Sequence, residues 1–117
     1  MNYVQHQLRN LPAAHRGLLQ DLACTPLTQR QLTEKYGFVF EEVPDELSMT
    51  EASFVATASG RLFVILCRRG IPEWSNTIRT ELSDEPLATY VPRMLSEFSE
   101  ATDFADGDLD RIWTESA

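Results

Sequence analysis

The stretch from Ser53 to Gly70 constrains the fold more than any other part of this chain, because it holds two β-prone runs separated by one short turn. Gly60 can supply the positive φ angle that a tight hairpin turn requires, and Ser59 precedes it. The second run, Leu62 to Cys67, is apolar without interruption, which is typical of a strand covered on both faces. The sequence therefore predicts a central β-hairpin over residues 53–67.

The length of the turn fixes the register of this hairpin, because a shift of one residue moves every side chain to the opposite face. A two-residue Ser59-Gly60 turn places Ala56 opposite Phe63 and Phe54 opposite Ile65 on one face of the sheet. Since the second strand is apolar throughout, we expect both faces of the sheet to need cover.

Leucines and one histidine recur at intervals of three and four residues between Leu8 and Leu22, which is typical of an amphipathic helix. Pro12 suits a first helical turn, so we expect regular helix from there to about Cys24. His15 lies on the apolar side of this helix, where a packing role suits it better than a role as ligand or base.

A second helix is predicted over residues 28–36 by signals at both of its ends. Thr28 and Gln31 have the spacing of a capping box, and Gly37 can take the left-handed conformation that ends a helix. Because so short a helix is not stable alone, we expect it to pack on the preceding one and form an N-terminal helical hairpin.

Two more strands are predicted, over residues 38–43 and over residues 77–82. The second alternates, with Ile78, Thr80 and Leu82 facing inward, and we place it at the edge of the sheet.

The last regular element is a helix that begins after Ser83. Its apolar stripe includes Leu87, Val91 and Phe98, and Pro92 should kink or interrupt it. These elements together predict one α+β domain over residues 1–117. Its parts are an N-terminal helical hairpin, an antiparallel sheet of about four short strands, and a C-terminal helix interrupted near Pro92.

Charge is distributed unevenly along the chain. Residues 1–80 hold eight acidic and eight basic side chains, whereas residues 81–117 hold ten acidic ones against only Arg93 and Arg111. The net charge of −8 therefore belongs to the C-terminal segment. Such a segment repels phosphate backbones and attracts basic protein surfaces, so we expect no nucleic-acid partner. A solvated face that keeps the chain in solution is the alternative interpretation.

The sequence predicts neither a membrane span nor a secretory signal. No apolar run approaches the roughly 20 residues that a span requires, and the first residues lack the basic-then-apolar order of a signal peptide. We therefore expect a cytoplasmic protein without a membrane partner.

No pattern in the chain indicates a catalytic centre, a metal site or a cofactor. The five glycines stand singly, so no phosphate-binding loop is predicted, and zinc ligands do not cluster. Cys24 and Cys67 occur in apolar contexts, which favours two small buried side chains over a disulfide. With Gly107 at the sixth position of a calcium loop, only Asp106 falls on a ligand position. We expect no bound metal and no cofactor.

Two groups of residues are the candidates for contact with a partner. The first is the acidic string near the C-terminus, and the second is a loop containing Trp and Arg, the residue types enriched at interface hot spots. The loop has a structural alternative, in which Trp74 packs on Ile71 and the arginines pair with acidic residues of the chain. The candidate partner-binding residues are Asp103, Asp106, Asp108, Asp110, Arg68, Arg69 and Trp74.

We expect a non-enzymatic protein-binding domain, most of all an inhibitor of the immunity-protein or antitoxin kind that places its acidic surface on a basic toxin. The alternative is a homodimeric regulatory or adaptor domain that uses an apolar sheet face. A third hypothesis is a small-molecule binder or enzyme with a pocket between sheet and helices, using His15, Cys67 or Arg79.

Overall fold

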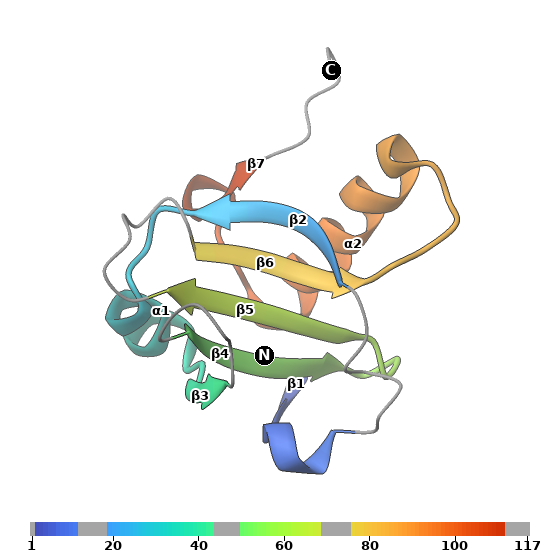
Figure 1. Ribbon diagram of the computed structural model, residues 1–117. Helices are drawn as coiled ribbons and strands as arrows, with labels where there is room; N and C mark the ends of the chain where they lie inside the picture. The colour runs from blue at the N-terminus through green and yellow to red at the C-terminus, as the bar shows by residue number, and fades with distance from the viewer. Residues whose placement is uncertain (1, 12–18, 44–49, 69–75, 112–117) are drawn as a thin grey trace.

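The computed structural model describes residues 2–11, 19–43, 50–68 and 76–111. In these residues the fold is α+β, with one antiparallel sheet of seven strands and two α-helices (Figure 1). The strands are β1 (Tyr3–His6), β2 (Leu19–Thr25), β3 (Glu41–Val43), β4 (Thr50–Thr57), β5 (Leu62–Arg68), β6 (Asn76–Glu81) and β7 (Asp110–Arg111). The helices are α1 (Gln29–Tyr36) and α2 (Leu87–Thr102), and the 3-10 turns are η1 (Leu8–Asn10) and η4 (Asp106–Asp108).

The strands lie in the order β1-β4-β5-β6-β2-β7, and β3 pairs with β4 on the same side as β1 (Figure 1). The Gln5 side chain of β1 forms hydrogen bonds with the backbone of Val39, which precedes β3. Its Nε2 donates to the carbonyl of Val39 at 3.1 Å, and its Oε1 accepts from the amide N–H of Val39 at 3.1 Å. A side-chain amide thus pairs with this backbone as a neighbouring strand would.

The central hairpin is present as β4 and β5, but its predicted register is wrong by one residue. The Thr57 carbonyl accepts from the Gly60 amide, and the Thr57 amide donates to the Arg61 carbonyl, both at 2.9 Å. The turn therefore has three residues, with Gly60 in the left-handed region at φ +87°. Phe54 consequently lies opposite Val64.

The predicted N-terminal helical hairpin is wrong. Residues 19–25, expected to be the end of a helix, form strand β2, and β1 precedes it; residues 12–18 lie outside the described part. The pairing of β2 with β6 shifts between Asp21 and Ala23, which is a β-bulge at Leu22. Leu22 and Ala23 are both fully buried. Leu19 and Leu22 belong to different core clusters, one on each face of the sheet, so their spacing of three residues imitates a helix in a strand that is covered on both faces.

The expected sheet of about four strands is also an underestimate. The prediction missed β1, β2 and the two-residue β7, and only residues 41–43 of the predicted strand 38–43 pair with a neighbour. β6 confirms the inward positions of Ile78 and Thr80, but it lies between β5 and β2 rather than at the edge. Leu82 lies beyond β6 and is half exposed.

The signals that predict α1 are confirmed at both ends of the helix. The Thr28 side chain accepts from the Gln31 amide, and the Gln31 side chain accepts from the Thr28 amide. Gly37 ends the helix in the left-handed region at φ +77°. Leu32 and Tyr36 form its buried side. α1 packs on the sheet rather than on a preceding helix.

The C-terminal helix α2 is confirmed, but the predicted interruption at Pro92 is wrong. The helix runs from Leu87 to Thr102 as one element that contains Pro92. The proline removes one hydrogen bond, to the carbonyl of Ala88. Both residues lie on the exposed side, where water can solvate that carbonyl. In the described residues, no helix is long and apolar enough to cross a membrane.

Both helices lie on one face of the sheet (Figure 1). Between them and the strands is the larger core cluster, which includes the stacked rings of Tyr36 and Phe104 with centroids 4.3 Å apart. The opposite face holds a smaller cluster, made of Leu11, Ala52, Phe54, Leu62 and Val64. Asn2 contacts the last turn of α2, since its amide donates to the Ala101 carbonyl at 2.7 Å.

Candidate functional site

The acidic residues from Glu97 to Asp110 are carried by α2 and by the segment that follows it. We define the acidic surface as four exposed carboxylates, one on α2, one at its C-cap, one in η4 and one in β7. These are Glu100, Asp103, Asp106 and Asp110. Three of the four predicted partner-binding aspartates therefore belong to this exposed surface.

The chain turns sharply after α2 because Asp103 adopts the left-handed conformation at φ +58°. Phe104 then enters the core, where it stacks on Tyr36. The Ala105 amide donates to the Tyr36 hydroxyl at 3.0 Å. A buried ring and a hydrogen bond to α1 thus position the acidic turn that follows.

Asp108, the fourth predicted aspartate, is occupied within the chain. Its Oδ2 accepts from Lys35 Nζ and from the Tyr36 hydroxyl, each at 2.5 Å. These two hydrogen bonds, that of Lys35 first, hold the pKa of Asp108 below its ordinary value. The same contact raises the pKa of Lys35. Asp108 therefore ties η4 to α1 rather than facing a partner.

A hollow of about 390 Å³ lies beside the acidic surface, between α2 and the segment that contains η4. Glu100 and Asp106 supply its charges, while Pro92, Leu95 and Leu109 supply apolar area. The surface there combines carboxylates with exposed hydrocarbon, a combination that suits the stem and the charged head of a basic side chain.

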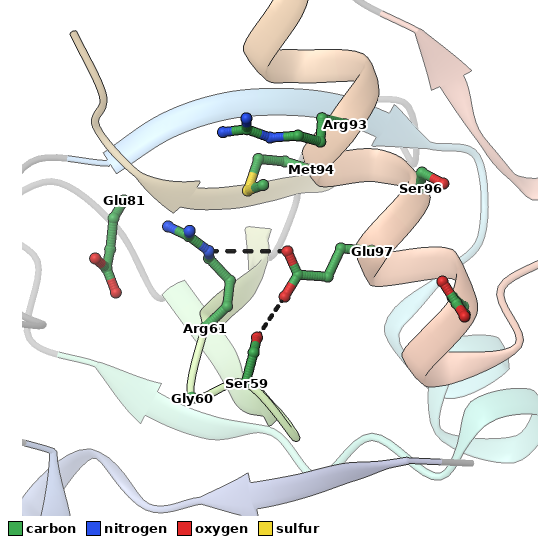
Figure 2. Close-up of a pocket in the computed structure, with 9 residues that line it drawn as sticks. Ser59, Gly60, Arg61, Glu81, Arg93, Met94, Ser96 and Glu97 are labelled. Atoms are coloured by element: carbon green, nitrogen blue, oxygen red, sulfur yellow. Dashed lines mark hydrogen bonds and ion pairs between the residues drawn. The ribbon is translucent and has the colours of Figure 1, made fainter. Parts of the chain in front are cut away.

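A second hollow, of about 830 Å³, lies between the β4–β5 turn, the end of β6 and α2 (Figure 2). We call it the hairpin hollow. The turn contributes Ser59, Gly60 and Arg61, β6 contributes Glu81, and α2 contributes Arg93, Met94, Ser96, Glu97 and Glu100. Glu100 and Ser96 line both hollows, so the two are neighbours along α2.

Glu97 attaches the β4–β5 turn to α2. Its Oε1 accepts from the Ser59 hydroxyl at 2.7 Å and from the Thr57 hydroxyl at 3.1 Å. Its Oε2 forms a longer ion pair with Arg61 Nε at 3.9 Å (Figure 2). Arg93, on the preceding turn of α2, pairs with Glu85, and its guanidinium carbon lies 5.8 Å from the centroid of the Tyr90 ring.

The predicted loop residues give no further part of the site. The backbone of Arg68 ends β5, while its side chain, together with Arg69 and Trp74, lies outside the described residues.

Of the groups named for a small-molecule or catalytic role, the two that the structure describes, Cys67 and Arg79, lie on opposite faces of the sheet. Burial raises the pKa of the Cys67 thiol to about 12, which keeps it protonated at neutral pH. Arg79 forms an ion pair with Asp21 at 2.7 Å, and His15 lies outside the described residues. Both cysteines are free thiols. In the described ranges no group of three or more His, Cys, Asp or Glu could hold a metal ion.

Comparisons with known proteins add no family to these observations. No protein-family model, no curated protein and no solved structure matches the chain.

Sequence reasoning missed Arg61, Glu97 and Glu100, although part of the signal was readable. Arg93, Glu97 and Glu100 recur at helical spacing, which places them on one side of α2. The ion pair of Glu97 with Arg61 joins residues 36 positions apart in sequence, on a helix and beside a turn. Local patterns do not carry that information.

Proposed function

We propose that this chain is a protein-binding domain that docks its acidic surface on a basic partner, as an inhibitor of the immunity-protein or antitoxin kind does. The single observation that carries the proposal is the exposure of Glu100 and Asp106 beside a hollow with apolar area. Charges so placed speed association and select a partner of opposite sign.

The structure refines which residues we assign to this function. Asp108 is withdrawn from the proposed contact because Lys35 and Tyr36 occupy its carboxylate. Glu100 takes its place, since it is exposed and lines both hollows.

The test begins with capture of a partner from extracts of the source cell, followed by purification of the protein that mass spectrometry identifies. The association rate is then measured by stopped flow for the wild type and for E100K/D106K at about 0.15 M ionic strength, where a Debye length of about 8 Å limits the effect of distant charges. We expect the variant to associate about tenfold more slowly or worse, with a smaller change in the dissociation rate.

A matched control is E34K/E42K, which makes the same change in net charge at exposed residues of α1 and β3. It should associate within about twofold of the wild type if the site is local rather than a property of net charge. Equal association rates for E100K/D106K and the wild type would sink the proposal.

The homodimer alternative stays a prediction. The five buried residues of the smaller cluster, on the sheet face away from the helices, expose 6% or less within the single chain, while Leu19, Val43 and Leu66 around them are partly buried. The centre of that face is therefore closed within the single chain. Light scattering over a range of concentrations tests it directly, since a dimer requires a concentration-dependent mass.

A further inference from the structure

The sheet ends at β1, and the hydrogen-bond pattern of its neighbour β4 shows which backbone groups of β1 face outward. Alternate residues of an antiparallel strand bond to the strands on its two sides. The Thr57 amide donates across the β4–β5 turn, so Thr57 and every second residue before it bond to β5. Ala56 and Phe54 therefore bond to β1. Their partners there are Val4 and His6, whose backbone groups point into the sheet.

The backbone N–H and C=O groups of Tyr3 and Gln5 consequently point away from β4. The side chains of these two residues bond to the backbone of Tyr36 and Val39. In the described residues their outward-facing backbone groups form no hydrogen bond. The edge of β1 is thus a row of unpaired donors and acceptors, which is a template for another strand.

β1 lacks the features that keep sheet edges from pairing. Among the described residues the other strands that end the sheet are β3 and β7, which are three and two residues long and carry acidic side chains. Short strands, charges and prolines are the usual protection of an edge. The sequence of β1 is Tyr-Val-Gln-His, with no lysine, acidic residue or proline. β1 therefore presents an edge that is open to a further strand.

Val4 stands between the two residues whose backbone is unpaired. Tyr3 packs on the core cluster under the helices, so the next side chain, that of Val4, lies on the opposite face of the sheet. In the single chain 60% of Val4 is exposed. A β-branched side chain stabilises a sheet by packing on the residue directly across from it in the next strand. On the outer side of β1 the described residues supply no such neighbour for Val4.

The edge of β1 is complementary to itself. When two β1 strands lie antiparallel with a two-fold axis at Val4, Tyr3 of each copy is opposite Gln5 of the other. Each Tyr3–Gln5 pair exchanges two hydrogen bonds, so every outward-facing group of both residues gains a partner. The two Val4 side chains meet at the axis with Cβ atoms about 4.5–5.5 Å apart. An unrelated strand also offers backbone groups, but a second copy brings the matching apolar side chain to Val4 in the same register.

The surroundings of the edge leave room for a second strand. A hollow of about 920 Å³ adjoins Gln5 and His6, and η1 and Val39 also line it. In the two-fold register, Asn2 of the second copy is opposite His6 and therefore lies at this hollow. One basic and one acidic side chain line the hollow, so the negative charge of the chain is not concentrated there.

We propose that two copies of this chain pair through β1, as antiparallel strands related by a two-fold axis at Val4, so that their two sheets become continuous. This interface contains no residue of the acidic surface, so it does not depend on the proposed function. It also differs from the homodimer considered above, which uses a face of the sheet instead of its edge.

The first test is the mass of the full chain in solution, measured by light scattering over a range of concentrations. We expect the mass to rise from that of one chain toward that of two. V4K places two like charges at the centre of the pair and should raise the dissociation constant of the dimer by at least about tenfold. L82K is the matched control, because Leu82 is 52% exposed but lies beyond β6. It should dimerise within about twofold of the wild type.

Amide hydrogen exchange, followed by NMR in the wild type, identifies the surface that pairs. The Tyr3 and Gln5 amides should exchange at least about tenfold more slowly when most of the chain is dimeric. The Val4 and His6 amides should change less, because they already bond to β4 in the single chain.

A chain that stays monomeric up to about 1 mM would overturn the proposal, and so would a V4K variant that dimerises as tightly as the wild type. A dimer whose Tyr3 and Gln5 amides exchange as fast as in the monomer would assign the contact to another surface, such as the sheet face. Protection of these amides by a captured partner protein alone would assign the edge to that protein. Each of these two results equally contradicts the pairing of two copies through β1.

Discussion

The two faces of the sheet are built in different ways. The face under α1 and α2 is packed with aromatic rings, and Phe38 alone has four ring neighbours with centroids within 6.4 Å. In the described residues, the cluster on the opposite face holds one ring, Phe54, among smaller aliphatic side chains. Ring pairs add stabilisation beyond the area they bury. We infer that the helical face dominates the stability of the fold and that it positions both hollows.

The largest expected effect is the loss of Phe38. F38A removes a fully buried ring and all four of its ring contacts, and we expect it to lower the free energy of unfolding by about 3–5 kcal/mol. F54A is the matched change on the other face, and it should cost at least about 1 kcal/mol less because it loses no ring pair among the described residues. Urea unfolding measures both losses, provided that the slope of the free energy of unfolding against urea concentration is the same for the two variants. Equal losses would contradict the difference between the two faces.

The second prediction concerns the connection from the helical face to the acidic turn. D108N removes the charge that accepts from Lys35 and Tyr36, and we expect a loss of about 1–2 kcal/mol, the lower figure if solvent screens the Lys35 contact. The Asp108 pKa is lowered in the folded state, so its contribution is complete above the unfolded value of 3.8 and declines as pH falls below it.

Unfolding measured at several pH values tests whether the contribution of Asp108 declines in acid. The difference between wild type and D108N should be constant at neutral pH and should shrink toward zero in acid. A difference that persists at the lowest pH would mean that the charge of Asp108 is not what ties η4 to α1.

A smaller effect is expected at the start of α1. T28A removes the hydroxyl that accepts from the Gln31 amide and should cost about 1 kcal/mol. T28S keeps an accepting oxygen and should stay within about 0.5 kcal/mol of the wild type. Circular dichroism during thermal unfolding would separate them, and identical midpoints for T28A and T28S would argue against the cap.

The smallest effect on stability is expected at the acidic surface. E100K changes an exposed side chain and should alter the free energy of unfolding by less than about 0.5 kcal/mol. A larger loss would mean that Glu100 supports the fold, and any binding defect of E100K/D106K would then need another explanation. Urea unfolding of E100K and of the wild type under the same conditions measures this difference in free energy.

The elements that were predictable are those whose signals lie close together in sequence. Thr28, Gln31 and Gly37 define α1 within ten residues, and Gly60 marks the central turn. β2 was not predictable from its pattern, because Leu19 and Leu22 lie on opposite faces of the strand while their spacing of three residues is also that of a helix. The acidic surface could be located from charge counts, whereas the role of Asp108 depends on Lys35 and Tyr36, more than 70 residues away.

The hydrogen bond from Asn2 to Ala101 has a practical consequence for anyone who handles this protein. Asn2, Glu97 and Glu100 line one shallow hollow, so a purification tag or fusion partner joined ahead of Asn2 would emerge beside Glu100. Such an attachment would crowd the carboxylates that we assign to recognition and could hide a genuine interaction. Anchoring through an engineered side chain on the exposed face of α1, at Arg30 for example, keeps that region clear.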